Sequence, residues 1–343
     1  MNKLKLVCLA FCLCLPQAWA MGEKAYFSGK TMGTTYLVQA DLTNVELTAK
    51  QLQKRVETEL AEVNQSLSVF IEDSEITQVN RFTSKVPIML SKQLHDVLEI
   101  AQQVSLQTDG ALDITLGPVI EFWGFGVKPR DLQQKDRGQL EVARSKTGMD
   151  GFVLSANTLE KLIPSLMINP SAVAKGYGVD RVAQLLDQAG VNHYLIEIGG
   201  EIVTKGHPEL DRPWRVAITR PERLSLQYQQ IISVNNMALA TSGSYVNYIE
   251  SQGRTLSHII DPSTGMPIRN SVVSTTVLHR QCAVADAFAT AFMVLNSNRS
   301  IEIANQLGLA VMLIEQNEQG FKTHFSDAIY PYLLNHSDRL NGV

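Results

Sequence analysis

One carboxylate and one hydroxyl stand four residues apart in an alanine-rich, apolar stretch near the end of the chain. They are Asp286 and Thr290, in the sequence ADAFATAF. Four residues are about one helical turn, so both side chains project from the same face of a helix. Mg²⁺ prefers oxygen ligands, takes one or two carboxylates from protein, and completes its shell with water and phosphate oxygens. The pair therefore predicts a site for a divalent cation that carries phosphates; the plainer alternative is a buried helix with an Asp near its N-terminus.

Six further segments group glycines, hydroxyl residues and charged residues along the chain. They are TMGTTY (31–36), WGF (123–125), NPSAVAKGYGVD (169–180), EIGGE (197–201), ATSGSY (240–245) and SHIIDPSTG (257–265). The chain has no P-loop, no dinucleotide-binding turn and no serine nucleophile elbow, because its nearest matches lack residues that those motifs require. Any phosphate chemistry in this chain would therefore use a phosphate-binding site of another kind.

Together with the Asp286 stretch, these segments resemble the ApbE family of FAD:protein FMN transferases over nearly the whole chain after residue 20. Their order and spacing match, and the combination is far more specific than any single motif. The resemblance implies an ApbE-like, T-fold-like architecture. It also implies an activity: such enzymes bind FAD with magnesium, split its pyrophosphate, and transfer FMN to a Ser or Thr hydroxyl of a target protein, releasing AMP.

The resemblance assigns a metal site and a cation beside it. Asp286 and Thr290 would be magnesium ligands, and backbone oxygens of Ala172 and Ala289 would complete the protein's share. A metal that bridges pyrophosphate oxygens neutralises charge on the departing AMP and orients the phosphorus for in-line attack. Lys175 would add a positive point charge on the phosphates. The alternative for Lys175 is an ordinary solvated lysine at the start of a helix.

The resemblance also implies a flavin-binding set. Its members are Met32, Trp123, Gly124, Phe125 and Ile260. Flat aromatic faces suit a fused ring system, so the WGF turn is the natural platform. An aromatic residue taken alone is more often part of the core. The assignment to flavin binding therefore rests on the match of the surrounding motifs to the ApbE family, and the aromatic residues by themselves do not support it.

Two positions depart from the family pattern. Phe70, counted with the flavin-binding set, stands where the family often has Tyr, so stacking can persist but a phenolic hydrogen bond cannot. Asn169, counted as both catalytic and nucleotide-binding, stands where the family commonly has Asp, and an amide cannot act as a general base. Two alternatives to FMN transfer therefore stay open: an FAD pyrophosphatase that uses water as the acceptor, and an FAD-binding protein without turnover.

The elements that must position these residues are helices and strands in irregular alternation. Apolar residues at helical spacing predict helices over 52–67, 94–104 and about 174–189, a helix around Asp286, and a short one near 301–307. Alternating apolar residues predict strands over 112–116, 193–198, 201–204, 214–219, 272–278 and 309–315. Because strands often follow one another directly, we expect an α+β fold of mixed, largely antiparallel sheets packed with helices.

The N-terminus predicts export. Two lysines precede an apolar run at residues 6–15, and Ala18 and Ala20 are small residues where a signal peptidase requires them. We therefore expect residues 1–20 to be a removable signal and residues 21–343 to form one transferase domain in the periplasm. Three of the four cysteines lie within the signal, so no intrachain disulfide is expected after cleavage. Phe11 precedes Cys12 and Leu13 precedes Cys14, where a lipoprotein needs a small residue, so we do not expect a lipid anchor.

Composition bounds the partners. The 343 residues carry a formal net charge of -4, which is not the basic footprint of a nucleic-acid-binding protein. Hydrophobic residues make up 45% of the chain, enough for a substantial core. We expect FAD as substrate and, by family analogy, exported segments of membrane NADH oxidoreductase subunits as acceptors. Transient contact with inner-membrane proteins would follow.

Overall fold

The computed structural model describes residues 24–127, 136–208, 212–222, 227–244, 248–251 and 254–334. The expected export signal, residues 1–20, lies outside them. The helices are α1 (Ala49–Leu67), α2 (Glu75–Arg81), α3 (Lys92–Gln107), α4 (Gly117–Phe122), α5 (Arg137–Arg144), α6 (Ser171–Gln188), α7 (Cys282–Val294) and α8 (Ser297–Leu307), with short 3-10 turns η2 (Met149–Gly151) and η3 (Asp327–Tyr332). The strands are β1 (Lys24–Thr31), β2 (Thr34–Asp41), β3 (Ile88–Met89), β4 (Phe152–Ser155), β5 (Thr158–Lys161), β6 (Tyr194–Ile198), β7 (Glu201–Lys205), β8 (Trp214–Thr219), β9 (Tyr228–Val234), β10 (Met237–Gly243), β11 (Tyr248–Ser251), β12 (Arg254–Ser257), β13 (Ile260–Asp261), β14 (Met266–Pro267), β15 (Val272–His279), β16 (Ala310–Asn317) and β17 (Gly320–Phe325).

One large sheet organises the described part of the chain. Its eight strands run in the order β1-β2-β6-β7-β10-β15-β16-β17. Every neighbouring pair in that order is antiparallel. The strands β7 and β10, in the middle of the sheet, come from distant parts of the sequence. The expected α+β class with largely antiparallel sheets is confirmed.

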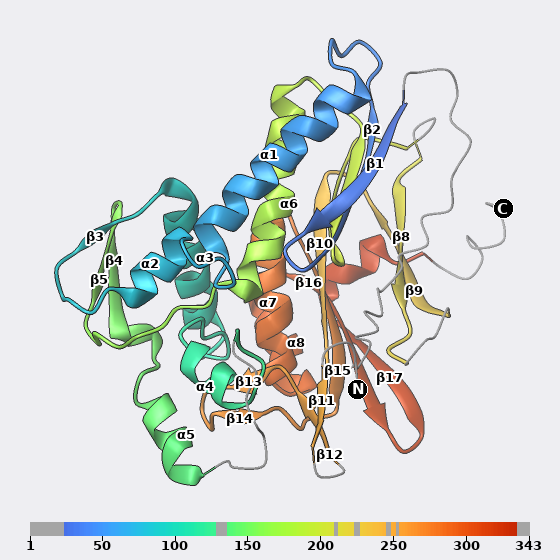
Figure 1. The fold of residues 1–343 in the computed structure, drawn as a ribbon. Helices are drawn as coiled ribbons and strands as arrows, with labels where there is room; N and C mark the ends of the chain where they lie inside the picture. The colour runs from blue at the N-terminus through green and yellow to red at the C-terminus, as the bar shows by residue number, and fades with distance from the viewer. Residues whose placement is uncertain are drawn as a thin grey trace, which may run out of the picture.

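Helices cover one face of the sheet and a hairpin covers the other (Figure 1). Helices α1, α6 and α7 pack on the first face, where apolar side chains of the strands meet those of the helices. The β8–β9 hairpin and the turn η3 pack on the second face around their own apolar cluster. Helix α7 is buried between the sheet and the helices α3 and α6, so almost its whole surface is apolar.

The expected helices form, and their ends have local causes. Helix α1 starts at a capping box in which Thr48 and Gln51 satisfy each other's backbone N–H groups. Helix α6 ends before Gly190, which has φ of 81°, and the N–H of Val191 donates to the carbonyl of Leu186. A glycine in this left-handed conformation is the usual stop signal for a helix.

The expected strand over 112–116 is wrong. Leu112, Ile114 and Leu116 are buried, as their alternation suggested, but the segment turns before α4. The carboxylate of Asp113 accepts hydrogen bonds from the backbone N–H and the hydroxyl of Thr115, at 2.6 and 2.5 Å. This side-chain turn competes with the extended backbone that a strand needs.

Within the described residues, no helix combines the length and the apolar character that crossing a membrane requires.

Candidate metal and flavin site

Helix α7 buries its one carboxylate deep in the fold. Asp286 is only 2% exposed, and its Oδ2 accepts a hydrogen bond of 3.0 Å from the main-chain N–H of Gly176 in α6. One turn later, the hydroxyl of Thr290 lies 3.3 Å from that of Ser242 at the end of β10. The predicted helix exists, and Asp286 and Thr290 lie one turn apart on it.

At Gly176 the backbones of α6 and α7 are in close contact. A Cβ atom at this position would stand 2.4 Å from the carbonyl oxygen of Cys282 and 2.8 Å from the Cα of Ala283. No side chain larger than hydrogen fits there without moving the backbone of α7. The glycine therefore allows its own N–H to reach Asp286.

Lys175 pairs with a carboxylate that sequence reasoning did not single out. Its Nζ lies 2.5 Å from Oε1 of Glu201, the first residue of β7, which is 1% exposed. Burial raises the pKa of Glu201 to about 8, although the positive charge of Lys175 opposes this shift. Burial lowers the pKa of Lys175, but attraction to Glu201 and Asp286 outweighs it and the pKa is raised. The sequence feature that could have identified Glu201 as a site residue is its place at the end of the EIGGE segment.

The cluster of Lys175, Glu201 and Asp286 has the electrostatics of a cation site. Two carboxylates face one ammonium group, and burial raises the pKa of both acids. Burial penalises the charged form, so a further positive charge would stabilise the two anions. Both carboxylate oxygens of Glu201 are buried, and the ion pair with Lys175 is the contact that offsets the charge of this carboxylate.

The donor set around Asp286 suits magnesium. Among the described residues no three His, Cys, Asp or Glu side chains gather into a metal cluster. One carboxylate, the hydroxyl of Thr290 and a main-chain carbonyl are oxygen donors of the kind Mg²⁺ uses when phosphates supply the rest. Ala172 lies four residues before Gly176, so in a regular helix its carbonyl is the partner of the Gly176 N–H, the group that donates to Asp286. Ala289 lies mid-helix in the apolar core.

Asn169 forms a side-chain turn just before α6. Its Oδ1 accepts hydrogen bonds from the backbone N–H and the hydroxyl of Ser171, at 3.1 and 2.6 Å. Its own N–H donates to the carbonyl of Ile114 at 2.6 Å. This arrangement joins the start of α6 to the segment before α4. An Asp side chain could accept the same two hydrogen bonds.

The WGF turn follows α4 and lies against the loop that contains β13 and β14. The indole N–H of Trp123 donates to the carbonyl of Gly265 at 2.7 Å. Gly124 has φ of 83°, a conformation that favours glycine, and the Phe125 ring meets the ring of His258 edge to face at 6.4 Å. Ile260 is 4% exposed and packs beneath this turn in an apolar cluster with α4 and α5. Trp123, Phe125 and Ile260 thus belong to one unit.

Met32 and Phe70 lie on two turns, the first between β1 and β2 and the second after α1. Met32 and Gly33 form the two-residue loop between β1 and β2, with φ of 48° and 73°, as a type I′ hairpin turn requires. The Met32 side chain reaches α6, since a Cβ on Gly178 would stand 2.7 Å from its methyl carbon. Phe70 follows α1 and is 65% exposed. An exposed aromatic ring on a turn is open to a ligand.

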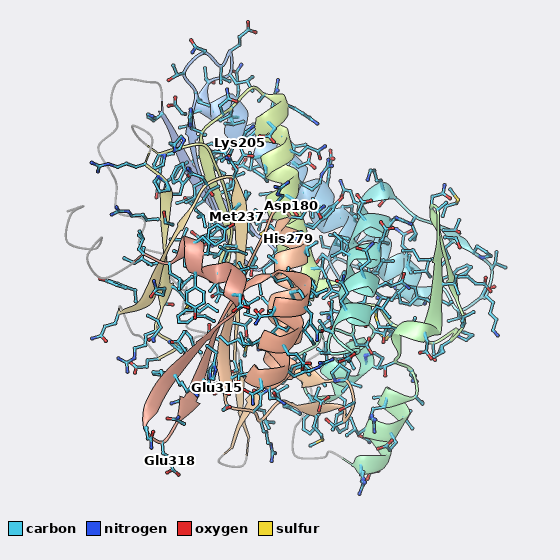
Figure 2. The ribbon with its side chains drawn as sticks, turned by 180° about the vertical axis from the view of Figure 1, so that it is seen from behind. Asp180, Lys205, Met237, His279, Glu315 and Glu318 are labelled. Carbon is cyan, nitrogen blue, oxygen red and sulfur yellow. The ribbon has the colours of Figure 1, made fainter. Side chains whose placement is uncertain are left out.

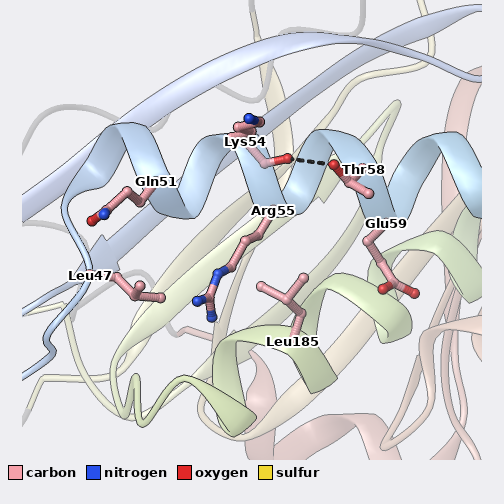
Figure 3. A pocket seen from close by; sticks show the side chains of 7 residues that line it. All are labelled: Leu47, Gln51, Lys54, Arg55, Thr58, Glu59 and Leu185. Atoms are coloured by element: carbon pink, nitrogen blue, oxygen red, sulfur yellow. Dashed lines mark hydrogen bonds between the residues drawn. The ribbon is translucent and has the colours of Figure 1, made fainter.

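A separate hollow of about 420 Å³ lies between α1 and the far part of α6 (Figure 3). It is lined by Leu47, Gln51, Lys54, Arg55, Thr58, Glu59 and Leu185. None of these residues belongs to the cluster around Asp286, and Glu59 is held by an ion pair with Arg181 at 2.7 Å. We therefore assign the candidate chemistry to the Asp286 cluster.

Comparison with known proteins identifies the family. The model of the ApbE family matches residues 32–313, which include Met32, Lys175, Asp286 and Thr290. The chain belongs to the ApbE family. A FAD:protein FMN transferase of Vibrio cholerae is 40% identical over 96% of this chain and 98% of its own length. One of Escherichia coli K12 is 34% identical over 91% and 90% of the two chains.

Solved ApbE structures have the same fold. The flavin transferase ApbE of Vibrio cholerae superposes with a TM-score of 0.85 at 39% identity, covering 91% of this chain and all of its own. The apo form of the Pseudomonas stutzeri flavinyl transferase ApbE gives a TM-score of 0.84 at 30% identity, covering 92% and 98%. The predictions of an ApbE-family member and of a transferase enzyme are confirmed. The assignment of individual site residues stays a prediction.

Proposed function

We propose that this ApbE-family protein uses Mg²⁺ to transfer FMN from FAD to a Ser or Thr hydroxyl of an exported acceptor protein, with release of AMP. The family and the names of its relatives support a FAD:protein FMN transferase. The observation that carries the magnesium proposal is the buried cluster in which Asp286, Lys175 and Glu201 meet at the contact of α6 and α7.

Asp286, Thr290 and the carbonyl of Ala172 are the groups that would hold the metal. Bound there, Mg²⁺ would neutralise the charge that develops on the leaving phosphate of AMP. Lys175 reaches this place from the first turns of α6 and stays protonated at neutral pH, so it presents a fixed positive charge toward phosphate oxygens. Glu201 holds its ammonium group from the sheet side.

The WGF turn, Met32 and Phe70 are our proposed flavin contacts. Trp123 and Phe125 are fixed by the hydrogen bond to Gly265 and by the ring contact with His258, so their faces are held in place before a ligand arrives. A rigid aromatic platform binds a fused ring with little loss of conformational entropy. Phe70 would add an exposed ring that can stack without a phenolic hydrogen bond.

We place the reaction in the periplasm, with exported segments of membrane redox proteins such as NADH oxidoreductase subunits as acceptors. The lysines, the apolar run and the small residues of the first 20 positions support export. Export would bring the enzyme to the surface at which such acceptors face the periplasm.

Incubation of the purified protein with FAD, MgCl₂ and a candidate acceptor separates transfer from its alternatives. A fluorescent acceptor band on a denaturing gel, with stoichiometric AMP, supports the proposal. AMP and free FMN without labelled acceptor would instead show a pyrophosphatase. Unchanged FAD with every acceptor offered would show a binding protein, and activity that persists in excess EDTA would remove magnesium from the proposal.

A further inference from the structure

Helix α7, which carries Asp286 and Thr290, lacks a cap of its own. The first N–H groups of a helix have no partner within it, and a side chain just before the helix usually accepts from them. Gln281 occupies that position in α7, and its side chain makes no capping hydrogen bond. The N-terminal end of α7 is also buried, since Cys282 and Ala283 have no exposed surface.

The missing cap is supplied across the interface by Asp180 of α6. Its Oδ1 accepts from the N–H of Cys282 at 2.7 Å, and its Oδ2 accepts from the N–H of Ala283 at 2.9 Å. Figure 2 labels Asp180 on α6 and His279 at the end of β15, the strand that leads into α7. One carboxylate therefore satisfies two backbone donors of another helix.

Asp180 and Gly176 lie one turn apart on α6, and each makes a hydrogen bond to α7, at successive turns of that helix. Asp180 holds the backbone at the first turn of α7, and Gly176 donates its N–H to Asp286 one turn later. Two contacts at different levels oppose both sliding and rotation of α7 about its axis. Since Asp286 and Thr290 follow Cys282 at intervals of four residues, a rotation of α7 would turn both away from the site together.

We infer that Asp180 is a positioning residue for metal binding: by capping α7 from the neighbouring helix, it aims Asp286 and Thr290 at the cation. This inference rests on the proposed magnesium site. Hydrogen-bonding partners that orient metal ligands typically change metal affinity by about 10- to 100-fold when they are removed. Asp180 touches neither metal nor substrate, so its effect falls on the metal-dependent step through α7.

The test measures metal binding directly, with Mn²⁺ as an EPR-visible probe, on the full-length protein as isolated. Asp180→Asn keeps the volume and one acceptor oxygen, so we expect its Kd for Mn²⁺ to rise about tenfold. Asp180→Ala loses both acceptors and should show a larger rise; the Asn variant carries the test if the Ala variant does not fold. In FMN transfer, the Mg²⁺ concentration at half-maximal rate should rise while kcat at saturating Mg²⁺ stays within a few fold.

Asn296→Ala is the matched control. Asn296 caps α8 through the N–H of Arg299 at 3.0 Å, so its loss removes a helix cap of similar kind away from α7. We expect this variant to lose thermal stability with an unchanged Kd for Mn²⁺. Equal changes in Kd in both variants would show a general effect of lost stability and overturn the inference.

Two outcomes separate this inference from the proposed function. If wild type binds Mn²⁺, Asp286→Ala does not, and Asp180→Asn binds as tightly as wild type, the positioning role of Asp180 is wrong while the metal site stands. If wild type and Asp286→Ala bind Mn²⁺ equally weakly, the metal site itself is wrong and the inference falls with it.

Discussion

Replacement of Gly176 with alanine would force α6 and α7 apart at the level of the candidate metal site. The added Cβ would stand 2.4 Å from the carbonyl oxygen of Cys282, whereas ordinary contacts begin at 3.4 Å, so α7 must retreat by about 1 Å. The neighbouring atoms belong to backbone, which cannot rotate away as a flexible side chain can. The strain therefore reaches the whole first part of α7.

The expected magnitude follows from two opposing effects. Alanine gains up to about 1 kcal/mol over glycine inside a helix, whereas overpacking of a rigid core typically costs about 1–3 kcal/mol. With the full gain for alanine, we expect a net loss of up to about 2 kcal/mol in the free energy of unfolding. A displacement of about 1 Å at a catalytic group can cost about 100-fold in rate, so kcat should fall far more than stability suggests.

Urea denaturation and FMN transfer at saturating FAD and Mg²⁺ are the assays. Gly178→Ala is the stability control on the same helix, since its added Cβ would press on the flexible end of Met32, at 2.7 Å, and reach the side chain of Ile198 at an ordinary contact distance of 3.4 Å. We expect Gly178→Ala to unfold at the same urea concentration as wild type or a higher one. A Gly176→Ala enzyme with wild-type stability and wild-type kcat would refute the close contact between α6 and α7.

Three further predictions test other parts of the structure. Asp286→Ala should lose turnover by more than 100-fold. It should unfold at a similar or higher urea concentration than wild type, because it removes a buried carboxylate whose pKa burial has raised. Retained Mg²⁺-dependent transfer would exclude Asp286 from the site. Asn169→Asp should leave FAD affinity and transfer within a few fold, because Asp can accept the same hydrogen bonds from Ser171; a gain of many fold would show that the native amide impairs transfer. Burial lowers the pKa of Lys161 from 10.5 to about 8, so its neutral form is favoured in the fold. Stability of wild type relative to Lys161→Met should therefore rise by up to about 3 kcal/mol from pH 7 to pH 10.5, and parallel pH profiles would contradict this.

Local signals predicted much of the helical layer. The apolar spacing of Leu52 to Leu67 and the glycine at position 190 located α1 and the end of α6, because helix faces and helix stops depend on residues within a few positions. Local reasoning failed at 112–116, where the alternation was real but Asp113 and Thr115 formed a turn. Whether a side chain such as that of Asp113 accepts the hydrogen bonds of nearby backbone groups depends on local geometry, and the alternation of apolar residues carries no information about it.

The strand order lay beyond local signals. That β7 pairs with β10, and β2 with β6, depends on contacts between residues far apart in sequence, which neither periodicity nor turn residues specify. Strands β7 and β10 both contact α7, so Glu201 and Ser242 come to the face that α7 covers. The sheet therefore determines which motif residues can meet Asp286.

The site divides in the same way. The types and spacing of Asp286 and Thr290 predicted an oxygen-rich face on one helix, because helical period alone aligns residues four apart. The partners of that face came only from the tertiary structure: Glu201 from β7 beside Lys175, the N–H of Gly176 on Asp286, and the carboxylate of Asp180 on α7. Chemistry that depends on residue type and local period can be read from the chain, whereas the burial and pairing that set its charge balance arise only when distant segments pack together.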